Sequence, residues 1–168
     1  MENIITPVVM DYFLKLSLAM LFGMLIGTER IIAHKTAGMR TYALVSMGAA
    51  LFVIIADMSV LFYPTLTGYN PSVITAAIVS GIGFLGTGLM IWRDKEHLSG
   101  LTSATGLWIS AGIGMAVGYG LYELGLIATL LTLFIFVVMW FLEEQIKKLP
   151  ATKRSAERDV NGTITPEE

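Results

Sequence analysis

The chain has 168 residues, of which 55% are hydrophobic and 14% charged, and its formal net charge at pH 7 is −2. A soluble domain usually carries about 25% charged residues, so this composition indicates a membrane protein. The absence of cysteine excludes disulfides, thiolate metal sites and cysteine nucleophiles, and the slightly acidic balance provides no basic field for binding nucleic acid.

Five apolar segments have the length of about 20 residues that a helix needs to cross a bilayer. They are Val8–Gly27, Met39–Val60, Val73–Trp92, Leu101–Tyr119 and Leu124–Leu142. The first follows an acidic start and has no small-residue cleavage site, so we interpret it as a retained span rather than a signal peptide. The predicted fold is all-α and polytopic, with a transmembrane domain over residues 1–142. The polar tail over 143–168 is expected to extend the last helix by two turns and to be disordered beyond Pro150.

The distribution of basic residues predicts the orientation. Ten of the 11 Lys and Arg residues fall in the first and third connections, at the start of the second span and in the tail, and Lys15 is the exception. Because such residues favour the cytoplasmic side, we predict an N-terminus outside and a C-terminus in the cytoplasm.

Three charged residues lie within apolar segments, namely Asp11 and Lys15 in the first span and Asp57 in the second. Helix rise places the two carboxylates at similar depth near the outer boundary, and Lys15 can reach Asp11 one turn away. One interpretation is a structural ion pair of Lys15 with Asp11 or Asp57. The other is an outward-facing cation site, for which Asp11 and Asp57 are weak metal-ligand candidates because the ammonium offsets one carboxylate.

A group of polar side chains occupies the connection predicted over 28–38 and the start of the second span. Its members are Glu29, Arg30, His34, Lys35, Arg40 and Thr41. The cations fit ordinary anchoring at the inner interface, and they could also bind lipid phosphate or contact a partner protein. Anchoring does not explain Glu29, for which we expect a fixed salt bridge to Arg40 or Arg30.

The third span contains "SGIGFLGTGLM", which matches the G-x-G-x-x-G spacing of a dinucleotide-binding turn. That motif requires a preceding strand, whereas the residues here belong to one apolar span, so we reject a nucleotide site. Two interpretations stay open. The helix is continuous and packs closely through Ala77, Gly81 and Gly88, or it is broken over Gly81–Gly88 beside a cavity.

Small residues four apart form a narrow face on two other spans, which favours close helix packing. These residues are Ala19, Gly23 and Gly27 in the first span, and Gly106, Ser110, Gly114 and Gly118 in the fourth. The fifth span is mostly Leu, Ile, Phe and Val. We therefore predict a tight bundle of the first four spans with the fifth span peripheral and facing lipid, and a homodimer formed through the glycine-lined faces.

Three sequence blocks resemble the MgtC/SapB family of bacterial membrane proteins. They are "GTERIIAHKTAGMRTYALVSMGAALF", "GIGFLGTGLM" and "GLTSATGLWISAGIGMAVGYG", in that order. The residues that the resemblance singles out are Gly27, Glu29, Arg30, Gly38, Arg40, Thr41, Gly81, Gly83, Phe84, Gly86, Gly88, Gly100, Leu101, Thr102, Ala104, Trp108 and Gly112. With Asp57 they form the candidate functional motif.

The resemblance implies a protein of the bacterial inner membrane linked to growth in low magnesium and to virulence, with no cofactor. It implies action through other membrane proteins, such as an ATP synthase or a magnesium-transporting P-type ATPase, and no nucleic acid partner. No catalytic set of residues emerges from the sequence, so we expect a non-enzyme; the alternative is a small cation transporter or channel with a site at the third span. Longer members carry an ACT-type C-terminal domain, whereas a short polar tail follows Leu142 here, so we expect regulation through that domain to be absent.

Overall fold

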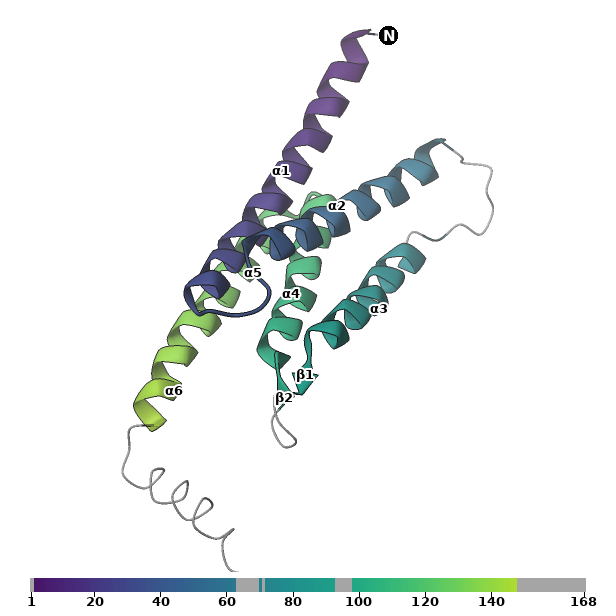
Figure 1. Cartoon of the computed structure of the whole chain (residues 1–168). Helices are drawn as coiled ribbons and strands as arrows, with labels where there is room; N and C mark the ends of the chain where they lie inside the picture. Colours follow the sequence, from purple (N-terminus) through teal and green to yellow (C-terminus); the bar gives the residue numbers. More distant parts are fainter. Residues whose placement is uncertain (1, 63–69, 71, 93–97, 148–168) are drawn as a thin grey trace, which may run out of the picture. The chain divides into compact units, whose positions relative to one another are not determined.

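The computed structural model describes residues 2–62, 70, 72–92 and 98–147. These residues are almost entirely helical, in keeping with the predicted fold class (Figure 1). The elements are α1 (Glu2–Ile32), α2 (Met39–Phe62), α3 (Ser72–Leu89), β1 (Ile91–Trp92), β2 (Leu98–Ser99), α4 (Leu101–Gly118), α5 (Tyr122–Phe134), the π-helical turn η1 (Ile135–Met139) and α6 (Trp140–Lys147).

Five helical segments are long and apolar enough to cross a membrane. They are Pro7–Ile32, Met39–Val60, Ser72–Leu89, Leu101–Gly118 and Tyr122–Ile146. All five predicted spans are therefore confirmed as helices, and the chain is a multi-pass membrane protein. The orientation across the membrane stays a prediction.

The chain divides into two compact units, residues 1–133 and 134–168. In the second unit the described part consists of η1 followed by α6, which continues past Leu142 to Lys147. The predicted boundary between residues 142 and 143 stays a prediction. The predicted disorder beyond Pro150 lies outside the described residues, as do Arg93 and Lys95 of the third connection.

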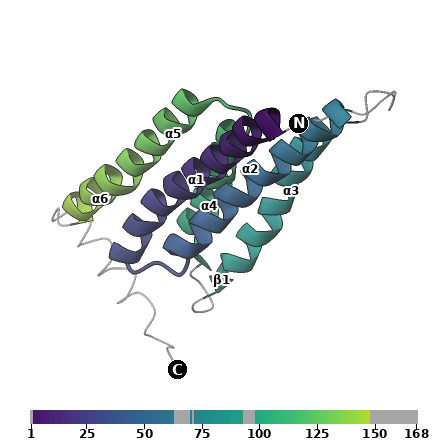
Figure 2. The ribbon, with the colours of Figure 1, turned by 90° about the horizontal axis from the view of Figure 1, so that it is seen from above.

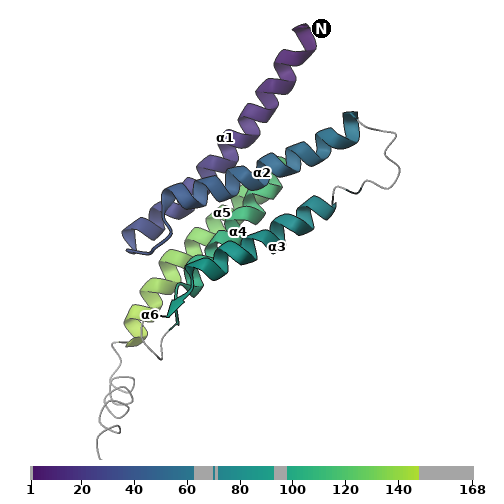
Figure 3. The same cartoon turned by 45° about the vertical axis from the view of Figure 1, so that its right-hand side comes forward.

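Helix α2 packs most extensively against α1 and α4, and α3 lies mainly against α4 (Figures 1 and 3). Figure 2 shows α1, α2 and α3 in that order across the unit. The small-residue faces predicted on α1 and α4 are confirmed. A Cβ on Gly23 would lie 2.9 Å from the Ala43 Cα, and one on Gly118 would lie 3.1 Å from the Ala50 Cα. Backbones in such contact gain van der Waals attraction, which lipid cannot replace at the same density.

Helix α3 confirms the interpretation of a continuous helix but not the packing expected of its glycines. It is continuous from Ser72 to Leu89, so the predicted break over Gly81–Gly88 is wrong. Close packing through Gly81 and Gly88 is also wrong, because a Cβ on either would meet nothing within 4 Å. The contact with α4 is instead made at Gly86, where a Cβ would lie 3.4 Å from the Ala104 Cβ.

The connection between α3 and α4 includes a two-stranded antiparallel hairpin, which the sequence did not predict. Ile91 pairs with Ser99, and Trp92 pairs with Leu98. Gly100 follows with a φ of 100°, a conformation that an L side chain rarely adopts, and its carbonyl accepts the first helical bond of α4 from the Ala104 N–H at 2.9 Å. The hairpin and this glycine together fix where α4 begins.

The end of α1 lies further along the chain than predicted. The helix continues to Ile32, so Glu29 and Arg30 are helical residues rather than loop residues. It ends in a Schellman motif with His34 at φ 54°, in which Lys35 N–H donates to the Arg30 carbonyl at 2.9 Å and His34 N–H to the Ile31 carbonyl at 3.0 Å. Arg30 is therefore a buried and paired residue of the last helical turns rather than an interfacial loop residue.

Candidate functional site

A buried ion pair lies near the C-terminal end of α1. The Arg30 guanidinium pairs with the adjacent Glu29 carboxylate, and the Arg30 side chain is 3% exposed. The predicted salt bridge of Glu29 is thus made to Arg30, whereas Arg40, at the start of α2, is exposed. A buried charge needs such compensation, because removing an ion from water costs several kcal/mol. The pair is therefore a fixed element of the fold at this end of the bundle.

Beside the ion pair, Tyr42 of α2 connects three helices. It is fully buried and lies within electrostatic range of both Glu29 and Arg30. Its hydroxyl donates to the Ser103 carbonyl at 3.1 Å, and its own carbonyl accepts from the Ser110 hydroxyl at 3.0 Å. Hydrogen bonds between helices in a membrane are worth about 0.6–2 kcal/mol each, so Tyr42 holds α2 and α4 in register next to the charges of α1.

Ser46 lies one turn after Tyr42 and is also fully buried. Its hydroxyl has no hydrogen-bond partner among the described residues. In a helix, a serine commonly donates to the carbonyl four residues earlier, but Ser110 already donates to that Tyr42 carbonyl. Tyr42 and Ser46 were missed by the sequence reasoning, although polar residues at i and i+4 on an apolar helix could have identified them.

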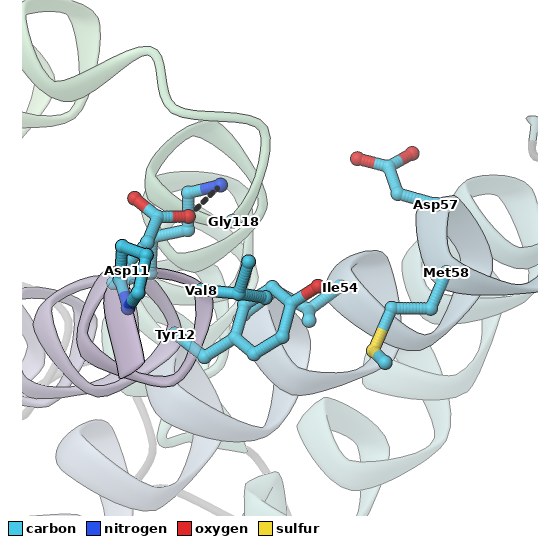
Figure 4. Close-up of a pocket in the computed structure, with 9 residues that line it drawn as sticks. Val8, Asp11, Tyr12, Ile54, Asp57, Met58 and Gly118 are labelled. Atoms are coloured by element: carbon cyan, nitrogen blue, oxygen red, sulfur yellow. Dashed lines mark ion pairs between the residues drawn. The ribbon is translucent and has the colours of Figure 1, made fainter. Parts of the chain in front are cut away.

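A groove of about 400 Å³ opens at the opposite end of α1 and α2. Asp11 and Lys15 come from α1, Asp57 from α2 and Gly118 from the end of α4 (Figure 4). The predicted ion pair is confirmed between Lys15 Nζ and Asp11 Oδ2 at 2.9 Å. The Tyr122 hydroxyl donates to the other Asp11 oxygen at 3.4 Å.

Both predicted carboxylates line this groove, and their similar depth near the outer boundary stays a prediction. In Figure 4, Asp11 and Asp57 lie on opposite sides of the groove. Among the described residues there is no group of three or more His, Asp or Glu side chains that could hold a metal ion. Because the Lys15 ammonium offsets one carboxylate, the groove suits a divalent cation less well than two unpaired carboxylates would.

The motif residues that the resemblance singles out do not gather at one cavity. Gly27 and Gly100 lie at close backbone contacts, where a Cβ would be 2.8 Å from the Met39 nitrogen and 3.1 Å from the Leu89 carbonyl carbon, respectively. A Cβ on Gly38 would lie 2.9 Å from Cγ1 of the Ile31 side chain. Others are on the surface: Phe84 is 81% exposed and Trp108 51%. The remaining exposed members are Arg40, Thr41, Gly81, Gly83, Gly88, Leu101 and Thr102. Asp57, which completes the candidate motif, is also exposed.

The comparisons with known proteins agree on one family. The model of the MgtC family matches residues 16–145. "Protein MgtC" of Salmonella typhimurium LT2 is 41% identical over 147 residues, which cover 88% of this chain and 60% of that protein. Escherichia coli K12 "Putative magnesium transporter YhiD" is 38% identical over 130 residues, which cover 76% of this chain and 60% of YhiD.

A third relative has a different name and a more similar length. "Protein SrpB" of Synechococcus elongatus is 40% identical over 131 residues, covering 71% of this chain and 69% of SrpB. No solved structure gives a significant match. The matched region thus spans only about 60% of the Salmonella and Escherichia relatives.

Proposed function

The chain belongs to the MgtC family, and on that premise we propose that it serves magnesium homeostasis and adaptation to low magnesium in the bacterial inner membrane. In this proposal it is not an enzyme. It acts by contacting other membrane proteins, such as an ATP synthase or a magnesium-transporting P-type ATPase. The names of the MgtC and YhiD relatives support the family and the link to magnesium.

The observation that carries the contact mechanism is the exposure of the second motif block. A Cβ at Gly81, Gly83 or Gly88 would meet nothing within 4 Å, and Phe84 projects outward from the same helix. Glycines on a membrane helix let another helix approach closely, and an exposed aromatic ring gives that contact a specific shape. A motif that lined a transport pathway would instead surround a cavity.

A pair of matched variants of α3 tests this proposal. Gly83→Leu adds bulk at an exposed glycine of the motif, and Ala76→Leu adds similar bulk at an exposed position outside the motif. Both variants and the wild type are expressed in a bacterium lacking its own copy, which is grown in low magnesium, and partners are purified by affinity from native membranes. We expect Gly83→Leu to lose growth rescue and partner recovery, and Ala76→Leu to keep both. Absence of rescue and of a partner for the wild type would refute the proposal.

A small cation transporter is the second candidate, and the outer groove with Asp11, Lys15 and Asp57 favours it. The continuous α3 removes the broken-helix argument for a site in the third span. Purified protein in liposomes containing a magnesium-sensitive dye tests this candidate. Flux that Asp57→Asn abolishes would support transport, and flux no faster than in empty liposomes would reject it. Asp57 is exposed, so this substitution leaves the fold intact.

A further inference from the structure

A groove of about 290 Å³ between α1 and α2 has an unusual lining. Four of the ten methionines of the chain meet there, Met20 and Met24 from α1 and Met39 and Met47 from α2. Leu44 adds to the apolar lining, and Arg40 contributes its methylene stem, since the lining itself is apolar. The charged head of Arg40 therefore lies beyond the apolar surface, as is usual for a long cationic side chain at an interface.

The groove places the charge of Arg40 at one end of α2 and Met47 further along the helix. Arg40 is the second residue of α2, and Met47 lies about 10 Å further along the helix by its rise per residue. The groove thus runs from the helix end, where lipid head groups lie, toward the bilayer centre. Methionine side chains are flexible and polarisable, and they adapt to an occupant without one fixed shape.

We propose that this groove binds one anionic phospholipid, with the phosphodiester on Arg40 and the upper part of an acyl chain against the four methionines. The inference is independent of the proposed function. A guanidinium binds phosphate oxygens through two parallel hydrogen bonds. Among the described residues Arg40 has no ion pair, whereas Arg30 is paired with Glu29. The exposed Lys35 in the preceding connection adds positive charge at this end.

The charge also decides against two other occupants. Thioethers are ligands for soft monovalent copper, but a guanidinium at the mouth opposes any cation. An apolar helix of another protein would fill the methionine surface but would leave Arg40 without a counter-charge. The larger groove of about 530 Å³ between α2 and α3 is apolar throughout and carries no such charge, so it provides a control surface.

Native mass spectrometry of the full chain in detergent, titrated with dioleoylphosphatidylglycerol, tests the assignment. We expect Arg40→Gln to weaken binding about five- to tenfold and Met20→Trp, which fills the groove, to weaken it similarly. Ala77→Leu, in the control groove, should weaken lipid binding less than Arg40→Gln does. Arg40→Lys, which retains the charge but not the paired donors, should also weaken lipid binding less than Arg40→Gln. Circular dichroism establishes that each variant is folded.

Three results would overturn the proposal. The first is equal binding of dioleoylphosphatidylcholine, which would remove the role of anionic charge. The second is full competition by glycerol phosphate, which would assign Arg40 to a free phosphate ester rather than a lipid. The third is silver(I) binding that Arg40→Gln leaves intact and Met20→Trp abolishes, which would assign the methionines to a soft metal.

Discussion

The backbone of Gly114 on α4 lies directly against the backbone of Ser46 on α2. A Cβ at Gly114 would overlap the Ser46 carbonyl oxygen and lie 2.9 Å from the Ser46 Cα. Gly112, two positions earlier on the same helix, has nothing within 4 Å of a Cβ. One helix thus offers a glycine that the fold requires and a glycine that it does not.

We therefore predict that Gly114→Ala destabilises the protein by about 1–3 kcal/mol, because the added methyl must push two backbones apart. Gly112→Ala should leave the free energy of unfolding unchanged or raise it by up to about 1 kcal/mol through helix propensity. Unfolding by sodium dodecyl sulfate in mixed micelles, followed by circular dichroism, measures both. Equal destabilisation by the two substitutions would contradict the contact.

The glycines of α3 give a second prediction. Replacing Gly81, Gly83 and Gly88 together by alanine should not lower stability, because none of the three Cβ positions meets another atom within 4 Å. Gly100→Ala is the contrast, because its φ of 100° and its contact with Leu89 both disfavour a side chain, and we expect a loss of about 2 kcal/mol or more. The same micelle unfolding measures both. A large loss for the triple variant would place another helix on this face within the folded chain.

The number and position of the spans could be predicted because each depends on local composition. The 19 residues from Leu124 to Leu142 carry no charge, and a segment of that kind crosses the bilayer whatever its neighbours are. The faces with residues four apart, such as Gly23 with Gly27, were also local patterns. They predicted that α1 packs closely through this face, and in the structure both glycines lie against the backbone at the start of α2.

What could not be predicted depended on which helix faces which. On α3, the spacing of Gly81 and Gly88 is as suitable for packing as that of Gly86, yet only Gly86 meets α4. Whether Arg30 or Arg40 pairs with Glu29 likewise depended on where α1 ends, and that end is fixed by hydrogen bonds around His34. Tyr42 forms hydrogen bonds with Ser103 and Ser110, which lie 61 and 68 positions later in the chain. No local sequence pattern spans such a separation.

The end of α1 gives a third prediction. His34 ends α1 in a left-handed conformation with a φ of 54°. Gly120 occupies the equivalent position at the end of α4, with a φ of 78°. A left-handed conformation costs a non-glycine residue about 1 kcal/mol, so His34→Gly should stabilise the protein by up to that amount and Gly120→Ala should destabilise it similarly. Thermal unfolding in detergent measures both changes. Destabilisation by His34→Gly would mean that an imidazole contact stabilises the fold by more than the left-handed conformation destabilises it.

The buried charge of Arg30 gives the last prediction. Glu29→Gln keeps the size of the side chain but removes the negative charge beside a guanidinium that is 3% exposed. We expect a loss of about 1–3 kcal/mol, because the buried guanidinium loses the negative charge beside it. Arg40→Gln, at an exposed cation, should cost under about 1 kcal/mol.

In the double variant Glu29→Gln/Arg30→Gln, the loss should be smaller than the sum of the two single losses, as measured by a double-mutant cycle in micelle unfolding. Additive losses would show that the two side chains are not coupled, and the ion pair would then contribute nothing to holding this end of the bundle.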